Sequence, residues 1–276
     1  MLNGETAEDI YRVLLDKGDD IGLELGQHAV HRGEADVVAL VEQHPVDVLG
    51  GHVLRRRLLL EDISAACAGF IFAMNIVEGF FKAGIYKTAL IIGAETLSKV
   101  TDWSDRGTCV LFGDGAGAAV LKAEETGIID MMMGADGTKG DVLACTSRTV
   151  GNFLTGTKPE LGFMTMDGQE VFKFAVRKVP ESVMELLQRT GTKKEDIKYY
   201  VLHQANERII EAAARRLKEP MEKFPMTISQ FGNTSTASIP LLLDDMIRKD
   251  MLKKGDKIIM SGFGAGMTWG AVLMEW

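Results

Sequence analysis

The stretch from Asp62 to Gly93 constrains the fold more than any other, because three patterns follow one another within it. A short strand ends near Ser64, the run from Phe70 to Gly84 is apolar on nearly every side, and Thr88 to Ile92 is a short apolar run. These patterns predict a strand, a buried helix and a buried strand. Such a unit indicates an α/β fold, in which ligand-binding and catalytic groups gather at the carboxyl ends of strands.

Cys67 lies in the corner between that first strand and the helix, among small residues that leave room for a substrate. A thiol at a helix N-terminus faces unpaired N–H groups and the positive end of the helix dipole, so we expect a lowered pKa and a nucleophilic thiolate. The alternative is a small core residue, because free cysteine is among the most buried residue types.

The overall composition excludes several classes of function. The net charge of −8 argues against broad nucleic-acid binding. No apolar run of about 18 residues and no signal peptide is visible, so we expect no membrane association. The three cysteines, Cys67, Cys109 and Cys145, lack CxxC spacing, which predicts neither a disulfide framework nor a zinc site and favours a reducing cytoplasm.

Two similar glycine turns lie far apart in the chain. A strand-like run follows Phe112–Gly117, whereas a dinucleotide-binding fingerprint requires a helix there. We therefore predict that these glycines allow close backbone approach in a packed core. Phe263–Gly266 repeats the Phe-Gly-x-Gly pattern before another strand, which indicates an internal duplication, with chance similarity as the alternative.

Further elements are predicted between and after these turns. The polar run Gly134–Gly162 is expected to be a long loop that serves as a lid or a binding surface. Pro180 is expected to kink or end its helix. The expected strands are Ile128–Met133, Lys198–Leu202 and Lys257–Met260, and the expected helices are Glu170–Leu187, Asn206–Leu217 and Ala237–Ile247.

Two polar residues occupy corners similar to that of Cys67. His203 follows the strand that ends at Leu202, and Asn233 lies in a loop before a helix. Taken singly, a histidine or an asparagine is more often structural. Three such groups at strand-to-helix corners predict one shared site.

Five motifs together resemble the β-ketoacyl-acyl-carrier-protein synthase III family, and the similarity runs from Glu61 to Trp276. They are Ser64–Phe70, Asp102–Gly107, Phe112–Ala119, His203–Asn206 and Gly232–Ser235. The resemblance implies the thiolase fold, with two duplicated halves in five αβαβα layers. It divides the chain into an atypical segment, 1–60, the rest of the first half with the nucleophile, 61–126, and a second half with the histidine and asparagine, 127–276.

The resemblance also implies a decarboxylating Claisen condensation that initiates fatty-acid synthesis. Cys67 would take the acyl group from an acyl-CoA primer, and malonyl-acyl-carrier protein would then lose carbon dioxide and attack it. His203 and Asn233 would donate hydrogen bonds to the malonyl thioester oxygen. The backbone N–H groups of Cys67 and Ala265 would form the oxyanion hole, with Ala265 in place of a family glycine. Coenzyme A enters as a thioester substrate, and no resident cofactor or metal is expected.

Other positions carry roles by the same resemblance. Arg106 matches a residue that contacts the coenzyme A nucleotide, and Arg208 matches one implicated in carrier-protein docking. Arg215 lies on the same helix face as Arg208, so the two predict a basic patch, with an ordinary solvated face as the alternative. A homodimer is also expected. The residues that match the lining of the pantetheine tunnel or acyl pocket are Gly168, Phe172, Ala205 and Asn206.

Residues 1–60 do not match the family. All 12 Phe and all three Trp follow position 60, and only 66 residues precede Cys67, fewer than in family members. The hypothesis is a shifted reading frame, a mis-joined start, or a deletion followed by divergence. It predicts a first half without its first strands, with exposed sheet edges. The alternatives to fatty-acid synthesis are a related enzyme of polyketide or quinolone synthesis and an inactive family member.

Overall fold

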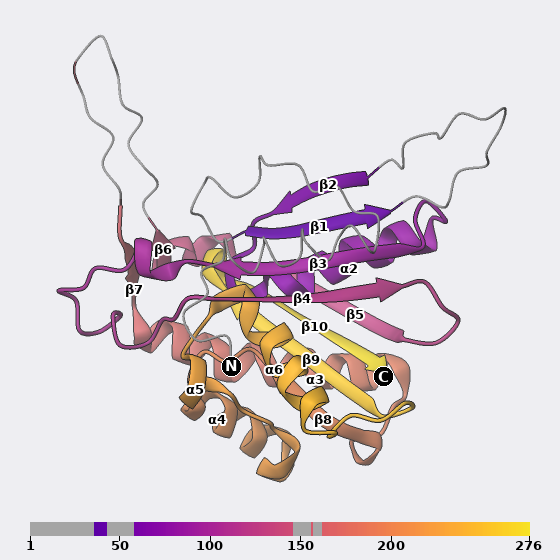
Figure 1. Cartoon of the computed structure of the whole chain (residues 1–276). Coiled ribbons are helices and arrows are strands. Elements are labelled where there is room, and N and C mark those ends of the chain that lie inside the picture. The colour runs from indigo at the N-terminus through magenta and orange to yellow at the C-terminus, as the bar shows by residue number, and fades with distance from the viewer. Residues whose placement is uncertain (1–35, 43–57, 146–155, 157–161) are drawn as a thin grey trace, which may run out of the picture.

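Two four-stranded sheets form the framework of the computed structural model, which describes residues 36–42, 58–145, 156 and 162–276 (Figure 1). The first sheet has the order β2–β1–β3–β4, and all its neighbouring pairs are antiparallel. The second has the order β5–β10–β9–β8, in which β8 and β9 are parallel and β10 is antiparallel to both β9 and β5. The strands are β1 (Asp36–Glu42), β2 (Leu58–Ile63), β3 (Thr88–Glu95), β4 (Gly115–Lys122), β5 (Ile128–Ala135), β8 (Ile197–Leu202), β9 (Lys257–Gly264) and β10 (Thr268–Glu275).

Helices lie between the sheets and on the outer face of the second sheet. In Figure 1, α2 (Gly69–Lys82) lies beneath the first sheet, where it contacts strands of both sheets, as does α6 (Ser238–Arg248). The helices α3 (Gly168–Thr190) and α4 (Glu207–Leu217) cover the other face of the second sheet. The described residues thus form four of the five expected layers, and a helix layer outside the first sheet is not among them.

The second sheet separates two hydrophobic cores, because its strands carry apolar side chains on both faces. In β9, Ile258 and Met260 face the core that contains α2 and α6, whereas Ile259 and Phe263 face the core that contains α3 and α4. This alternation follows from the period of two residues in a β-strand. It explains why the chain shows near-continuous apolar runs at these strands.

The segment 36–42 corrects the expectation that residues 1–60 supply no strand of the first half. It forms β1, which pairs with β3 from Asp36 opposite Ala94 to Glu42 opposite Thr88, and with β2 on its other side. For Ala35–Val41 the sequence alone predicts either a helix or a strand, and the apolar run Val37–Val41 suits a strand within a sheet. The rest of the segment up to Arg57, and with it the hypothesis about its origin, lies outside the described residues.

Most predicted elements are confirmed, with shifted boundaries. Asp167 caps the start of α3, where its side chain accepts hydrogen bonds from the backbone N–H groups of Gln169 and Glu170, and Gly191, with a φ of 66°, follows the last residue of the helix. Pro180 does not end this helix, which continues through it for ten further residues. α2 is buried over its first half, but Ile76 is 36% exposed, so the prediction of burial on nearly every side is wrong for its second half.

The predicted loop Gly134–Gly162 is partly ordered structure, because a 3-10 helix over Gly137–Val142 and the strand β6 (Leu143–Cys145) lie within it. β6 pairs with β7 (Met164–Met166). The parts 146–155 and 157–161 lie outside the described residues. The short helices elsewhere are η1 (Ala66–Ala68), η2 (Leu97–Lys99), η4 (Lys194–Asp196), η5 (Met221–Lys223), α5 (Ile228–Phe231), η6 (Ser235–Ala237) and η7 (Ala265–Met267).

The glycines of Phe112–Gly117 serve close packing, as predicted. The strand β4 begins among them at Gly115, so no helix N-terminus opens there for a phosphate. A Cβ on Gly113 would collide with the carbonyl oxygen of Phe231, and one on Gly115 would lie 2.9 Å from Cγ2 of Thr234. The turn therefore lets β4 lie directly against the loop that carries Asn233.

Candidate active site

Cys67 lies in η1, directly between β2 and α2, and is 7% exposed. The preceding residue, Ala66, has a φ of +47°, which is uncommon for a residue with a side chain. Its carbonyl oxygen accepts a 2.6 Å hydrogen bond from the Thr236 hydroxyl, and that of Ala65 accepts a 3.4 Å bond from Thr268. Residues of the second half therefore hold the corner that presents the thiol.

The protonation state of Cys67 differs from the prediction. Burial raises the pKa of the thiol to about 12; a hydrogen bond from Ser235 opposes this rise, and the negative charge of Glu95 adds to it. The expected thiolate, stabilised by the helix N-terminus, is therefore wrong for the unliganded site, because desolvation outweighs the nearby donors. Cys67 rests as a neutral thiol at neutral pH.

Gly264 brings the turn after β9 against the backbone of Cys67. A Cβ at this position would lie 2.7 Å from the Cys67 nitrogen and 3.2 Å from the Ala68 nitrogen, so a side chain does not fit without movement. Ala265 follows directly in η7. The two backbone donors predicted for the oxyanion hole, those of Cys67 and Ala265, thus belong to adjoining turns.

His203 follows β8 directly and is 2% exposed. Its backbone N–H donates to the carbonyl oxygen of Ser261 at 2.8 Å, and its ring packs edge to face against Phe263 with centroids 5.4 Å apart. The ring nitrogen Nδ1 lies 2.6 Å from the Ser238 hydroxyl oxygen. Burial lowers the pKa of His203 to about 3, so the imidazole is neutral at neutral pH.

Asn233 follows the short helix α5 and not a strand, so the predicted strand-to-helix corner is wrong for this residue. Its backbone forms a bridge around Phe112, with the N–H donating to the Leu111 carbonyl and the carbonyl accepting from the Gly113 N–H, both at 2.9 Å. The side-chain oxygen accepts a 2.9 Å bond from the Ser235 N–H. Because that partner can only donate, the amide nitrogen is left as the donor that Asn233 offers elsewhere.

One segment, residues 233–238, joins the three predicted catalytic residues. It contains Asn233, its Ser235 hydroxyl bonds the thiol of Cys67, and its Ser238 hydroxyl contacts the ring of His203. The thiol, the imidazole and the carboxamide, which lie far apart in the sequence, are therefore all linked to this one short segment. A nucleophile beside two neutral hydrogen-bond donors is suited to acyl transfer with a developing oxyanion.

Sequence reasoning assigned no role to several residues that support the site. Glu95, at the end of β3, is 1% exposed, and its carboxylate accepts a 3.2 Å bond from the Thr236 N–H. The Ser235 hydroxyl bonds the thiol of Cys67. The Thr236 hydroxyl donates to the Ala66 carbonyl oxygen, and the Ser238 hydroxyl contacts the ring of His203. The signal that could have found them is the run of hydroxyl residues that follows Asn233 and precedes an apolar helix.

The predicted substrate-binding residues lie on the surface nearby. The neighbours of Arg106, Asp105 and Gly107, line a pocket of about 710 Å³ together with Gly168, at the start of α3. Phe172 lies one turn further along α3 and is 37% exposed. The chain thus brings the Arg106 loop beside the helix that carries two predicted tunnel residues.

Asn206 and the two predicted docking residues belong to α4. The Asn206 side chain caps this helix by accepting a 2.9 Å bond from the Arg208 N–H, which is a structural use of a residue predicted to line the tunnel together with its neighbour Ala205. Arg208 and Arg215 are both exposed. Arg215 lies 3.6 Å from Glu211, which reduces the positive charge that the patch presents.

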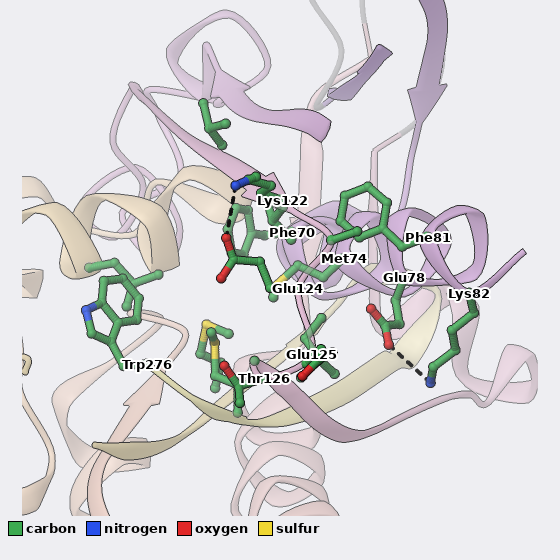
Figure 2. Close-up of a pocket in the computed structure, with 18 residues that line it drawn as sticks. Phe70, Met74, Glu78, Phe81, Lys82, Lys122, Glu124, Glu125, Thr126 and Trp276 are labelled. Atoms are coloured by element: carbon green, nitrogen blue, oxygen red, sulfur yellow. Dashed lines mark hydrogen bonds and ion pairs between the residues drawn. The ribbon is translucent and has the colours of Figure 1, made fainter. Parts of the chain in front are cut away.

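A second pocket, of about 560 Å³, lies along α2 beyond the catalytic corner (Figure 2). Phe70, Met74 and Phe81 of α2 line it together with Trp276, and the ion pairs Glu78–Lys82 and Lys122–Glu124 border it. None of the three predicted catalytic residues is part of its lining. It is therefore separate from the candidate active site.

Two negative observations apply to the part of the chain that the structure describes. None of its helices is long and apolar enough to cross a membrane. No group of three or more His, Cys, Asp and Glu residues within it could hold a metal ion.

Two segments of the chain match described protein families. Residues 61–137 match 3-Oxoacyl-[acyl-carrier-protein (ACP)] synthase III, and residues 187–276 match the C-terminal part described under the same name. A Clostridium novyi protein named beta-ketoacyl-[acyl-carrier-protein] synthase III is 52% identical over 217 residues, which are 78% of this chain and 67% of that protein.

Solved structures of condensing enzymes with related names also match this chain. The crystal structure of 3-oxoacyl-[acyl-carrier-protein] synthase III from Aquifex aeolicus matches with a TM-score of 0.71 at 44% identity, over 78% of this chain and 66% of that one. The priming beta-ketosynthase of a polyketide biosynthetic pathway matches with a TM-score of 0.69 at 34% identity, over 77% and 64%. This chain spans about two thirds of the length of these relatives.

Proposed function

Because this chain belongs to the 3-oxoacyl-(acyl-carrier-protein) synthase III family, we propose that it condenses an acyl-CoA primer with malonyl-acyl-carrier protein and so initiates fatty-acid synthesis. The observation that carries the proposal is the 233–238 segment, which contains Asn233 and contacts both Cys67 and His203. A hydrolase with a Cys–His pair needs its histidine as a base. A histidine whose pKa is about 3 is a poor base and a better hydrogen-bond donor.

In the first half-reaction, the sulfur of Cys67 attacks the carbonyl carbon of the acyl-CoA. The negative charge on the carbonyl oxygen is stabilised by the backbone N–H groups of Cys67 and Ala265. The carbon–sulfur bond to coenzyme A then breaks, and the departing sulfur takes up a proton in place of the one that Cys67 loses. The products are acyl-Cys67 and free coenzyme A.

In the second half-reaction, the malonyl thioester loses carbon dioxide, and its electron pair moves to the thioester oxygen as an enolate. His203 and Asn233 donate hydrogen bonds to this oxygen, and both are neutral donors within a buried site. The enolate carbon attacks acyl-Cys67, a carbon–carbon bond forms, and the bond to sulfur breaks. Protonation of Cys67 completes the cycle, and 3-oxoacyl-carrier protein leaves.

The remaining roles extend from the same proposal. The Arg106 loop, Gly168 and Phe172 bind coenzyme A at the pocket of about 710 Å³, and Ala205 and Asn206 line the path to Cys67. The chemistry needs no resident cofactor or metal, because the thioester supplies the activated carbonyl. The exposed arginines of α4, Arg208 and Arg215, attract the acidic carrier protein. The enzyme acts as a cytoplasmic homodimer.

A related role in priming polyketide synthesis is the second candidate, because a polyketide priming ketosynthase matches over 77% of this chain at 34% identity. Both candidates share the chemistry of Cys67 and differ in the primer and in the carrier protein. Condensation rates with a panel of acyl-CoA primers and with malonyl groups on fatty-acid or polyketide carrier proteins separate the two.

The test of the proposal is formation of 3-oxoacyl-carrier protein from acetyl-CoA and malonyl-acyl-carrier protein by the purified chain. We expect product with the wild type and with Cys145→Ser, a matched control at an exposed cysteine, but not with Cys67→Ser. Product formation that persists in Cys67→Ser, or that is lacking in the folded wild type with every primer and carrier, contradicts the proposal.

A further inference from the structure

We propose that Ser238 is a positioning residue that holds His203 as the Nε2–H tautomer, with the donor on the side of the ring opposite Ser238. The catalytic consequence of this inference rests on the proposed function. The tautomer itself does not, because it is a property of the resting protein that can be measured without substrate.

The hydrogen bonds of Ser238 decide which atom donates. Its hydroxyl oxygen lies 2.6 Å from Nδ1 of His203, and the backbone N–H of Gln204 points to the same oxygen at 3.4 Å. A backbone N–H can only donate, so the Ser238 oxygen is the acceptor in that contact. The hydroxyl hydrogen is then available for Nδ1, which accepts it through its ring lone pair.

The opposite arrangement leaves a buried hydrogen without an acceptor. If Nδ1–H of His203 donated to Ser238, the Ser238 oxygen would accept from both Nδ1 and the Gln204 N–H. These two groups are the partners of the Ser238 hydroxyl among the described residues, so its own hydrogen would have no acceptor. Ser238 and His203 are each 2% exposed, so solvent does not replace a missing partner. Leaving a buried donor unsatisfied is unfavourable, which selects the arrangement with Ser238 as donor.

The charge state of the ring completes the assignment. Burial lowers the pKa of His203 to about 3, so the ring is neutral near pH 7 and carries one N–H. With Nδ1 accepting from Ser238, that hydrogen is on Nε2. The edge-to-face contact with Phe263 and the backbone bond from His203 to the Ser261 carbonyl fix the ring and its main chain, so the donor direction is fixed as well.

The position of Ser238 explains how it can perform this function. It is the first residue of α6, whose buried face packs between the two sheets, and it directly follows η6, which holds Cys67 and Ala66. An N–H on Nε2 is required to stabilise the enolate oxygen in the second half-reaction. Acylation of Cys67 uses backbone donors instead, so loss of the Ser238 hydroxyl affects the two half-reactions unequally.

The first test is the nitrogen NMR spectrum of the full chain labelled with 15N-histidine, in which His203 is assigned through His203→Gln. We expect a protonated Nε2 and an unprotonated Nδ1 in the wild type and in Ser238→Thr, which keeps the hydroxyl. Ser238→Ala should increase the Nδ1–H population. A wild-type Nδ1–H tautomer overturns the inference even if no variant folds, and so does an unchanged tautomer in folded Ser238→Ala.

The second test compares the half-reactions in Ser238→Ala. Release of carbon dioxide from malonyl-acyl-carrier protein should fall roughly 100-fold to 1000-fold, as for loss of one oxyanion donor. Acylation of Cys67 by acetyl-CoA should change less than about 3-fold, and Ser238→Thr should restore decarboxylation. Equal loss in both half-reactions indicates a merely structural role and overturns the inference. A wild type that has the Nε2–H tautomer but no condensing activity refutes the proposed function and leaves the assignment of Ser238 standing.

Discussion

A methyl group added at Gly264 should disable the acylation step, because this glycine lies against the backbone nitrogen of Cys67. The Cβ of Gly264→Ala would lie 2.7 Å from that nitrogen, about 0.7 Å inside the 3.4 Å at which ordinary contact begins. The neighbouring atoms at 3.2 Å and 3.3 Å belong to Ala68 and Ala66, which cannot rotate away. The φ of Gly264 is −166°, so the backbone angle itself tolerates alanine and the steric contact is the cause of the effect.

The expected magnitude follows from two separate contributions. Overpacking of this kind costs about 1–3 kcal/mol of stability, which for a chain of this size lowers the melting temperature by roughly 2–10 °C. Displacement of the Cys67 N–H from the oxyanion hole should slow acylation by roughly 100-fold to 1000-fold. The loss of rate should therefore exceed what the loss of stability alone explains.

The assay is the rate of acyl-Cys67 formation from acetyl-CoA, followed by intact-protein mass spectrometry, alongside thermal unfolding. Gly262→Ala is the matched control on the same strand, because its Cβ would lie 3.3 Å from the Cys67 carbonyl oxygen and needs only a small adjustment. Its acylation rate should stay within about 3-fold of the wild type. A folded Gly264→Ala that acylates as fast as Gly262→Ala refutes the placement of the oxyanion hole.

Three further predictions concern stability, pH and docking. Thr236→Val removes the 2.6 Å bond to the half-buried Ala66 carbonyl and should lower the free energy of unfolding by about 1 kcal/mol in urea titrations. A change below about 0.5 kcal/mol contradicts the role of this bond. Burial lowers the pKa of His203 from 6.5 to about 3, so the contribution of its neutral ring to stability is present above pH 6.5 and is lost as the pH falls toward 3. His203→Gln should flatten this part of the curve of stability against pH, and an unaltered slope argues against a buried neutral ring. Arg208→Glu should raise KM for malonyl-acyl-carrier protein at low salt and leave KM for acetyl-CoA unchanged. The control Arg248→Glu on α6 should alter neither constant, and equal effects of the two variants would contradict docking at α4.

The sequence predicted the residues of the site better than their environment. Cys67 and His203 could be found because each follows a short apolar run and precedes a helix, and the structure places both after strands. Asn233 was found by its motif, although α5 and not a strand precedes it. The family and the fold that these motifs predicted are confirmed by the comparisons.

The protonation state of Cys67 could not be predicted, because it depends on burial by distant parts of the chain. Gly264 and the 233–238 segment close over a thiol that local sequence places at a helix N-terminus. The same holds for Glu95, which lies beyond the predicted strand Thr88–Ile92 and contacts Thr236, 141 residues away. Long-range contacts of this kind leave no periodic signal.

The segment of β1 was left open between a helix and a strand for a different reason. Its run of apolar residues lacks the alternation that identifies a strand exposed on one face, and the lack of recognised family motifs in residues 1–60 argued against any strand of the first sheet there. Pairing with β3 along seven positions shows that a segment without family motifs can still provide a strand. Composition and motif content therefore did not predict the local structure of this segment.

The central claim is that Cys67 carries the acyl group between the two substrates. A single-turnover experiment tests it most directly: the chain is incubated with acetyl-CoA, freed of excess substrate, digested and mapped by mass spectrometry, before and after addition of malonyl-acyl-carrier protein. The account predicts an acetyl group on the peptide that contains Cys67, which disappears as 3-oxoacyl-carrier protein forms. Acetyl transfer to another residue, or an acetyl-Cys67 that malonyl-acyl-carrier protein does not discharge, would contradict it.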